Sequence, residues 1–319
     1  DDRRSSGLLF PTIGADKENG LDFAQPIYWN IAPNYDATIT PRYIQERGTG
    51  LELDFRHLNS WSENQIIASY LGSDKGGADD DKIDLLTGLR PNQGEDRYLA
   101  GINHSGGLGR AWSTHLDINH VSDVDYFRDL GNLTLDDNSL THLQRRASAG
   151  YKTRHWNYSV AAQDYQVITQ GLDEQYWLLP QISADGYYRW SNSLVVDLKN
   201  RHSVFNHSDK RFVTGSRSSI DYGISWDKRW SWGYFKPQFR ARHLSYSLDA
   251  GQQSRLLDSD PSVSVPVYSI DTGIFLERNS GWLNNYKQYF APRLFYVRAD
   301  YKDQSNLPDF DTREFTPSY

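Results

Sequence analysis

Residues 51–56 decide the fold class, because they read Leu51-Glu52-Leu53-Asp54-Phe55-Arg56. Apolar and charged side chains alternate at every position of this stretch. Successive side chains of a β-strand point to opposite faces of a sheet, so the pattern predicts a strand with one apolar and one charged face. The same alternation predicts further strands in residues 112–119, 219–226, 235–242 and 268–277, and with them an all-β protein.

The connections between these segments fall into two classes. Tight turns are predicted at residues 33–36, 48–50, 105–107, 154–155 and 191–193. Long polar loops are predicted at residues 73–96, 123–139 and 249–262. Short turns at one end and long loops at the other are typical of an up-and-down antiparallel barrel of the outer membrane. We expect roughly fifteen such strands and, since no linker interrupts them, a single domain over residues 1–319.

The composition favours this membrane class over a soluble one. Aromatic residues make up 14% of the chain, yet the mean hydropathy is −0.72, and no run approaches the roughly 18 apolar residues of a membrane-spanning helix. A polar barrel interior with aromatic girdles fits both numbers. A β-sandwich or a propeller also alternates, but a charged face such as that of Glu52, Asp54 and Arg56 is too polar for a sandwich interior.

Charge and cysteine content exclude other classes. The net charge of −7 argues against a nucleic-acid partner, whose binding surfaces are usually basic. The chain has no cysteine, so it holds neither a disulfide nor a thiolate metal site. Residues 1–4 lack the apolar core of a signal peptide, and we therefore expect the sequence to begin inside a mature protein.

Several stretches resemble one family of outer-membrane proteins. The longest is the eighteen-residue run Pro26-Ile27-Tyr28-Trp29-Asn30-Ile31-Ala32-Pro33-Asn34-Tyr35-Asp36-Ala37-Thr38-Ile39-Thr40-Pro41-Arg42-Tyr43. Shorter ones are residues 103–106, 121–127, 163–167 and 303–305, in family order. On these residues the chain resembles LptD, the lipopolysaccharide-assembly family.

The resemblance implies a fold, a location and partners. It implies part of a transmembrane barrel of about 26 strands, a size that such barrels reach, without the periplasmic jelly-roll domain and the last strands. The implied location is the outer membrane of a Gram-negative bacterium. The implied function is translocation of lipopolysaccharide, with an LptE-like lipoprotein plug, a periplasmic bridge protein and membrane lipid as partners.

Pro11 and Pro26 are the candidate gate residues. Proline has no N–H to donate to a strand ladder, and these two interrupt the strand-like segments 7–13 and 21–31. The resemblance implies that they weaken pairing between the first and last barrel strands and so open a lateral gate. Read without the family, they are two ordinary edge prolines.

Charged side chains give two further candidates. Lys236, Arg240 and Arg242 alternate on one predicted face and could contact the phosphorylated head group of lipopolysaccharide or the plug, although a solvated wall explains them as well. Asp79, Asp80 and Asp81 could bind a divalent cation, but they lack the spacing of a known calcium loop and fit a solvated loop better. We expect no cofactor.

The sequence contains no recognisable catalytic motif. It has no G-x-S-x-G, no H-E-x-x-H and no P-loop, so we expect a transporter and not an enzyme. Two alternatives remain open. One is a passive diffusion porin, and the other is a soluble carbohydrate-binding protein with Trp61, Trp112 or Trp156 as stacking platforms.

Overall fold

The computed structural model describes residues 5–79, 83–131, 141–169, 171–172, 174–191, 193–249, 258–279 and 287–311. These residues form twenty β-strands and one short helix, α1 (Tyr126–Leu130), which confirms the all-β prediction. None of the described helical residues forms a segment long and apolar enough to cross a membrane. Contacts divide the chain into two compact units, Asp1–Ala149 with Gln163–Gln175 and Gly150–Ala162 with Tyr176–Tyr319. The single domain stays a prediction.

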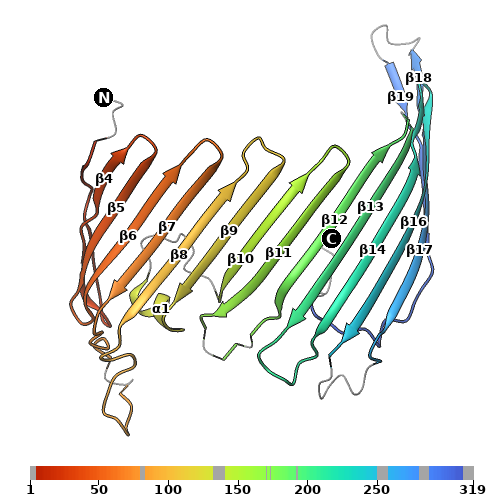
Figure 1. Cartoon of the computed structure of the whole chain (residues 1–319). Coiled ribbons are helices and arrows are strands. Elements are labelled where there is room, and N and C mark those ends of the chain that lie inside the picture. Colours follow the sequence, from red (N-terminus) through yellow and green to blue (C-terminus); the bar gives the residue numbers. More distant parts are fainter. Residues whose placement is uncertain are drawn as a thin grey trace. The chain divides into compact units, whose positions relative to one another are not determined.

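The first unit is an antiparallel meander in which each strand pairs with the next (Figure 1). Its first two strands are each divided in two, so that β1 pairs with β4 and β2 with β3. The strands are β1 (Gly7–Leu8), β2 (Thr12–Asp16), β3 (Gly20–Ala24), β4 (Ile27–Ala32), β5 (Tyr35–Ile44), β6 (Gly48–Leu58), β7 (Ser62–Leu71), β8 (Arg97–Gly106) and β9 (Trp112–Val121).

The connections of this unit lie at two different ends of the strands. Residues 33–34, 59–61 and 107–111 make the short-turn end. The opposite, long-loop end carries residues 17–19 and 45–47 together with the long connections 72–96 and 122–141, the last of which contains α1. The alternation of short turns and long loops follows the layout of outer-membrane barrels.

The two faces of the first unit differ in polarity. Ile66, Ile102 and Ile118 lie side by side on β7, β8 and β9, and they are 42%, 46% and 37% exposed. A row of exposed isoleucines is unfavourable in water but suits contact with lipid. We call this the apolar face, and it also carries Leu51, Tyr70 and Tyr98. The opposite, polar face carries Asp54, Arg56, Gln65, Asn103 and Asp117.

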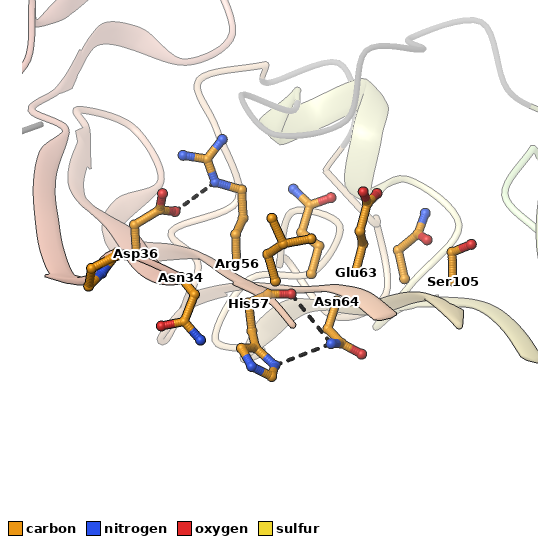
Figure 2. Close-up of a pocket in the computed structure, with 11 residues that line it drawn as sticks. Asn34, Asp36, Arg56, His57, Glu63, Asn64 and Ser105 are labelled. Carbon is orange, nitrogen blue, oxygen red and sulfur yellow. Dashed lines mark hydrogen bonds and ion pairs between the residues drawn. The ribbon is translucent and has the colours of Figure 1, made fainter. Parts of the chain in front are cut away.

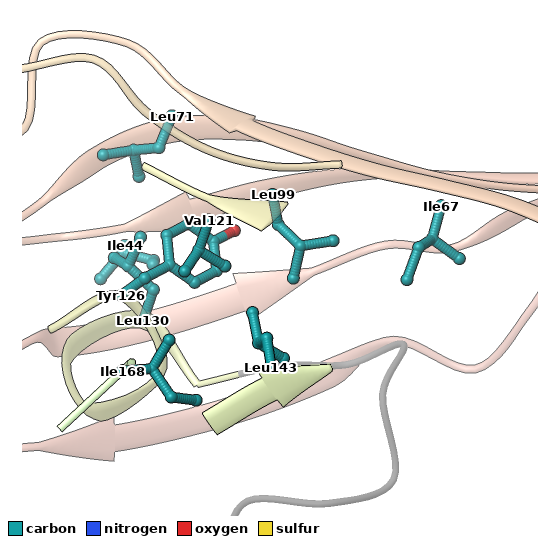
Figure 3. Packing of buried hydrophobic residues seen from close by; sticks show 9 residues of the cluster. All are labelled: Ile44, Ile67, Leu71, Leu99, Val121, Tyr126, Leu130, Leu143 and Ile168. Atoms are coloured by element: carbon teal, nitrogen blue, oxygen red, sulfur yellow. The ribbon is translucent and has the colours of Figure 1, made fainter. Parts of the chain in front are cut away.

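An apolar cluster covers the polar face at the long-loop end (Figure 3). Tyr126 and Leu130 of α1 pack there against strand ends such as Leu71, Leu99 and Val121. Burial of each such side chain stabilises the fold by roughly 1.5–3 kcal/mol. The polar face is therefore solvated toward the short-turn end and closed by side chains toward the long-loop end. The remaining members of the cluster are Ile44, Ile67, Leu143 and Ile168.

The second unit repeats the antiparallel pattern. Ile224, Phe239 and Tyr268 lie side by side on its apolar face and are exposed, whereas Asp197, Asp221 and Asp271 lie on its polar face. Its strands are β12 (Trp177–Arg189), β13 (Leu194–Asn206), β14 (Gly215–Trp226), β15 (Lys228–Trp230), β16 (Gly233–Leu248), β17 (Ser262–Ile274), β18 (Leu276–Asn279), β19 (Lys287–Phe290) and β20 (Arg293–Ala299).

Two strands and one segment complete the architecture. β10 (His142–Lys152) and β11 (Trp156–Val167) have residues in both units. In the second unit, Phe310 lies flat on Phe205 with ring centroids 4.3 Å apart, and Arg217 binds Asp311 at 2.6 Å. The segment after β20 thus packs back onto its own strands. Twenty strands exceed the roughly fifteen expected because short pieces such as β1, β15 and β18 are separate in the structure.

Candidate functional site

The first two strands are broken at the same level, and a predicted gate residue lies in each break. Pro11 lies between β1 and β2, and Pro26 lies between β3 and β4. The ladder pairs Leu8 with Ile27 below the break and Thr12 with Ala24 above it. Three residues, 9–11, therefore oppose two, 25–26, which is the arrangement of a β-bulge.

Hydrogen bonds show which residues beside the break face the second strand. The N–H of Gln25 donates to the carbonyl oxygen of Pro41 on β5 at 3.1 Å, so residue 25 faces β5 and its neighbours face the first strand. Ala24 is thus turned toward Thr12, and Thr12 toward Ala24. The N–H of Leu9 also faces the second strand, since it donates to the carbonyl oxygen of Pro26, so the regular alternation is interrupted between residues 9 and 12.

The outer edge of the first strand is open in the described part of the chain. β1 and β2 pair with β4 and β3 on one side, and they form the outermost strand of the meander (Figure 1). Pro11 has no N–H, so this strand has one backbone donor fewer than a strand of other residues. The side chains nearby are apolar, with Phe10 96%, Leu8 72% and Ile13 67% exposed.

The three predicted head-group cations lie on the polar face of β16, opposite carboxylates. Arg240 binds Asp197 at 2.7 Å and Asp221 at 2.5 Å. The Nε atom of Arg242 is 3.3 Å from Asp221, and Lys236 is paired in register with Asp271. The structure brings the three cations together on one face. It also gives Arg240 two anionic partners, which the sequence did not predict.

A polar cavity of about 470 Å³ opens at the short-turn end of the first unit. Figure 2 shows Asp36, Arg56 and Glu63 on one side of the sheet, and His57 and Asn64 on the other. Arg56 binds Asp36 at 2.7 Å. Gln65, Asn103 and Ser105 also line the cavity. The carboxylates, the amides and the hydroxyl of Ser105 in this lining suit a ligand rich in hydroxyl groups.

A buried ionic cluster lies at the long-loop end. Arg97 binds Asp74 at 2.9 Å, Asp129 at 3.1 Å and Asp123 at 2.8 Å, and Arg47 is 3.3 Å from Asp74. Asp74 belongs to the loop after β7, whereas Asp123 and Asp129 belong to the connection that contains α1. One arginine therefore ties two long connections to the start of β8.

Burial and hydrogen bonding act in opposite directions on Asp123. Burial disfavours the charged carboxylate, but hydrogen bonds from Arg97 and Ser122 hold the pKa of Asp123 below its ordinary value. The carboxylate is thus ionised at neutral pH and available to the cluster.

The acidic loop lies only partly within the described residues. Asp79 belongs to them, and Asp80 and Asp81 fall outside. Among the described residues, no group of three or more His, Cys, Asp or Glu side chains is arranged to hold a metal ion. The solvated loop that the sequence favours here therefore stays a prediction.

Two features of the site had little sequence signal. The side-chain amide of Gln25 contacts the carbonyl oxygens of Leu9 and Pro26. In the sequence it is an ordinary glutamine that precedes a proline, and no pattern distinguishes it. The sequence of residues 121–127 carries a family resemblance but no other functional signal. The structure gives it a physical role, since it supplies Asp123 to the ionic cluster and Tyr126 to the apolar cluster.

Comparison with known proteins gives a consistent result. The family model for LptD, LPS transport system D, matches residues 95–319. LPS-assembly protein LptD of Saccharophagus degradans is 36% identical, and those of Chromohalobacter salexigens and Alcanivorax borkumensis are 34% and 36% identical, each over the whole of this chain. The chain spans 39–41% of the length of these relatives.

One solved structure, OpdL of Pseudomonas aeruginosa, matches with 10% identity over 87% of each chain. Its TM-score of 0.29 is too low to support an inference.

The antiparallel up-and-down strands, with one exposed apolar face and one charged face, define an outer-membrane β-barrel protein. The chain belongs to the LptD family. The predicted fold class and the predicted location in the outer membrane of a Gram-negative bacterium are thereby confirmed, and the soluble carbohydrate-binding alternative was wrong.

Proposed function

We propose that this chain is part of an outer-membrane translocon that inserts lipopolysaccharide into the outer leaflet through a lateral gate at β1 and β2. One observation carries the proposal: Pro11, which has no N–H, lies in the break of the outermost strand, between β1 and β2. Membership of the LptD family supports lipopolysaccharide as the substrate. No catalytic step and no cofactor belong to the proposal.

The physical basis is the strength of the seam between the first strand and whichever strand closes on it. Each unmade backbone hydrogen bond costs several kcal/mol, roughly, in a lipid environment, since no water replaces the missing partner. A seam with a proline therefore forms fewer bonds and separates more readily. The bulge at residues 9–11 adds a second local weakness.

The two faces suit the two parts of an amphiphile. Acyl chains pass beside the exposed apolar side chains of Leu8, Phe10 and Ile13, and the sugar follows the polar face. The polar side chains that line the cavity at the short-turn end form hydrogen bonds with the hydroxyl groups of the saccharide. Lys236, Arg240 and Arg242 contact the phosphorylated head group by exchanging carboxylate partners for phosphate.

The proposal includes three partners besides the substrate. An LptE-like lipoprotein occupies the polar side, because a charged face accepts a folded polar plug. Membrane lipid covers the apolar face. A periplasmic bridge protein delivers the substrate through a part of the full-length protein outside residues 1–319.

Photocrosslinking in cells tests the substrate and the route together. The full-length protein carries a crosslinking residue in place of Leu9 or Trp29 near the gate, or Lys236 on the polar face. The control position is Ile224, which lies on the apolar face of the second unit. We expect lipopolysaccharide adducts at the first three positions and none at Ile224. Correctly inserted protein without adducts at any position would contradict the proposal and favour a passive diffusion porin.

A further inference from the structure

The ladder between the first two strands lacks one donor beside the bulge. Leu9 and Pro26 face each other, and the N–H of Leu9 donates to the carbonyl oxygen of Pro26 at 2.9 Å. Two residues of a hydrogen-bonded antiparallel pair normally exchange both N–H···O bonds. Pro26 has no N–H, so its backbone cannot return a bond to the carbonyl oxygen of Leu9.

A side chain supplies the missing donor. The Nε2 atom of Gln25 donates to the carbonyl oxygen of Leu9 at 2.9 Å and to that of Pro26 at 3.1 Å. The backbone N–H of the same residue is held by Pro41 on β5. Gln25 lies in the second strand, at the break between β3 and β4. Its backbone N–H is bonded to the third strand, β5, and its side-chain amide is bonded to the first strand.

We infer that Gln25 is a releasable latch that joins the first two strands at the position where Pro26 removes the backbone donor. A backbone N–H is fixed in direction by its strand, whereas a side-chain amide leaves its acceptor by rotation about its own bonds. The side-chain amide of Gln25 can therefore release the carbonyl oxygen of Leu9 while β3 stays paired with β2 and β4 stays paired with β1. Gln25 is a positioning residue, and the inference rests on the proposed gate for its role in transport.

The latch also holds the break in the first strand. Leu9 is the first residue of this break, and Pro11 lies two residues further along it. Release of the Leu9 carbonyl oxygen would therefore free the backbone next to Pro11. Gln25 acts on the seam through the first strand.

Hydrogen–deuterium exchange tests this assignment on the full-length protein with its lipoprotein partner in nanodiscs. The readout is the exchange rate of the Leu9 amide. Gln25→Leu removes the donor, and we expect exchange to accelerate roughly threefold to tenfold, the range for loss of one ordinary hydrogen bond. Gln25→Glu, which cannot donate when ionised, should give the same acceleration. Gln65→Leu is the matched control, because the amide of Gln65 donates to Asp54 on another strand pair.

The decisive arm uses Pro26→Ala, which restores the backbone N–H. In that background Gln25→Leu should change the exchange of the Leu9 amide by less than about twofold, since the acceptor already has its bond. Equal acceleration in both backgrounds would mean that Gln25 acts through packing, and it would overturn the latch. No acceleration in the native background would overturn it as well.

The exchange experiment needs no lipopolysaccharide, so the latch and the proposed function fail separately. Loss of the crosslinks with the exchange result intact would remove the transport role and leave the latch. Crosslinks at Leu9 without the exchange result would leave the transporter and remove the latch.

Discussion

The guanidinium of Arg97 binds the carboxylate of Asp74 at 2.9 Å, and the two side chains are 1% and 0% exposed. The same guanidinium contacts Asp129 and Asp123, so the pair is part of a network. Ion pairs at this depth are costly to form but more costly to break, because removing one partner leaves a buried charge uncompensated. Arg97 therefore holds two long connections in place over the polar face.

Replacement of this arginine should destabilise the protein far more than replacement of an exposed one. We expect Arg97→Met to lower the free energy of unfolding by about 3–5 kcal/mol. Arg128→Met is the matched control, since Arg128 also pairs with Asp129 but its side chain is 51% exposed, and the expected loss is below about 1 kcal/mol. Urea unfolding of the full-length protein in detergent measures both, and equal losses would contradict the account.

The ionic cluster should also make stability depend on pH in a defined direction. The pKa of Asp123 is lowered in the folded state, so its contribution is complete above the unfolded-state pKa of about 3.9. The contribution is lost as pH falls through the lower folded-state pKa. Asp123→Asn should therefore destabilise the protein at pH 7, and the difference from the native protein should shrink below about pH 4. A difference that stays constant between pH 7 and pH 3 would contradict the ionic role.

The segment after β20 should depend on one aromatic ring. Phe310 is 7% exposed and packs on Phe205, so Phe310→Ala should weaken docking of residues 303–311 by about 3–5 kcal/mol. Tyr301→Ala is the control, because Tyr301 is 90% exposed. Hydrogen exchange of residues 303–311 measures the docking. Unchanged protection in Phe310→Ala would show that Arg217 and Asp311 hold the segment without the ring.

The strands could be predicted from sequence because each has two different faces. Alternation in residues 51–56 and 219–226 places β6 and β14 correctly, and no tertiary information is needed for such a pattern. The apolar cluster at Leu99 and Val121 could not be predicted in the same way. These residues lie on the otherwise polar face, and their partners come from α1, a five-residue helix that has no periodic signal of its own.

The residues of the candidate site likewise differ in whether a sequence pattern marks them. Proline has no N–H, so the sequence marks Pro11 and Pro26 as breaks in the first two strands, and the structure places both at the same bulge. Their role in a gate was implied only by the family resemblance and stays a prediction. Gln25 and Arg97 act through partners that are distant in sequence or offered by backbone atoms. Their roles follow from geometry, because any glutamine or arginine in a strand has the same local pattern.

The central claim is that Pro11 weakens the seam through which lipopolysaccharide leaves. Pro11→Ala adds one N–H to the outermost strand, so it should strengthen the seam and slow export. Pro33→Ala is the matched control, since Pro33 lies in the short turn between β4 and β5, away from that edge.

The most direct measurement is a pulse–chase of newly made lipopolysaccharide to the cell surface, in cells whose full-length protein carries one of these changes at equal abundance. The account predicts that surface arrival slows roughly threefold to tenfold with Pro11→Ala, as one added hydrogen bond requires, and is unchanged with Pro33→Ala. Normal arrival with Pro11→Ala, or equal slowing with both variants, would contradict a gate at the first strand.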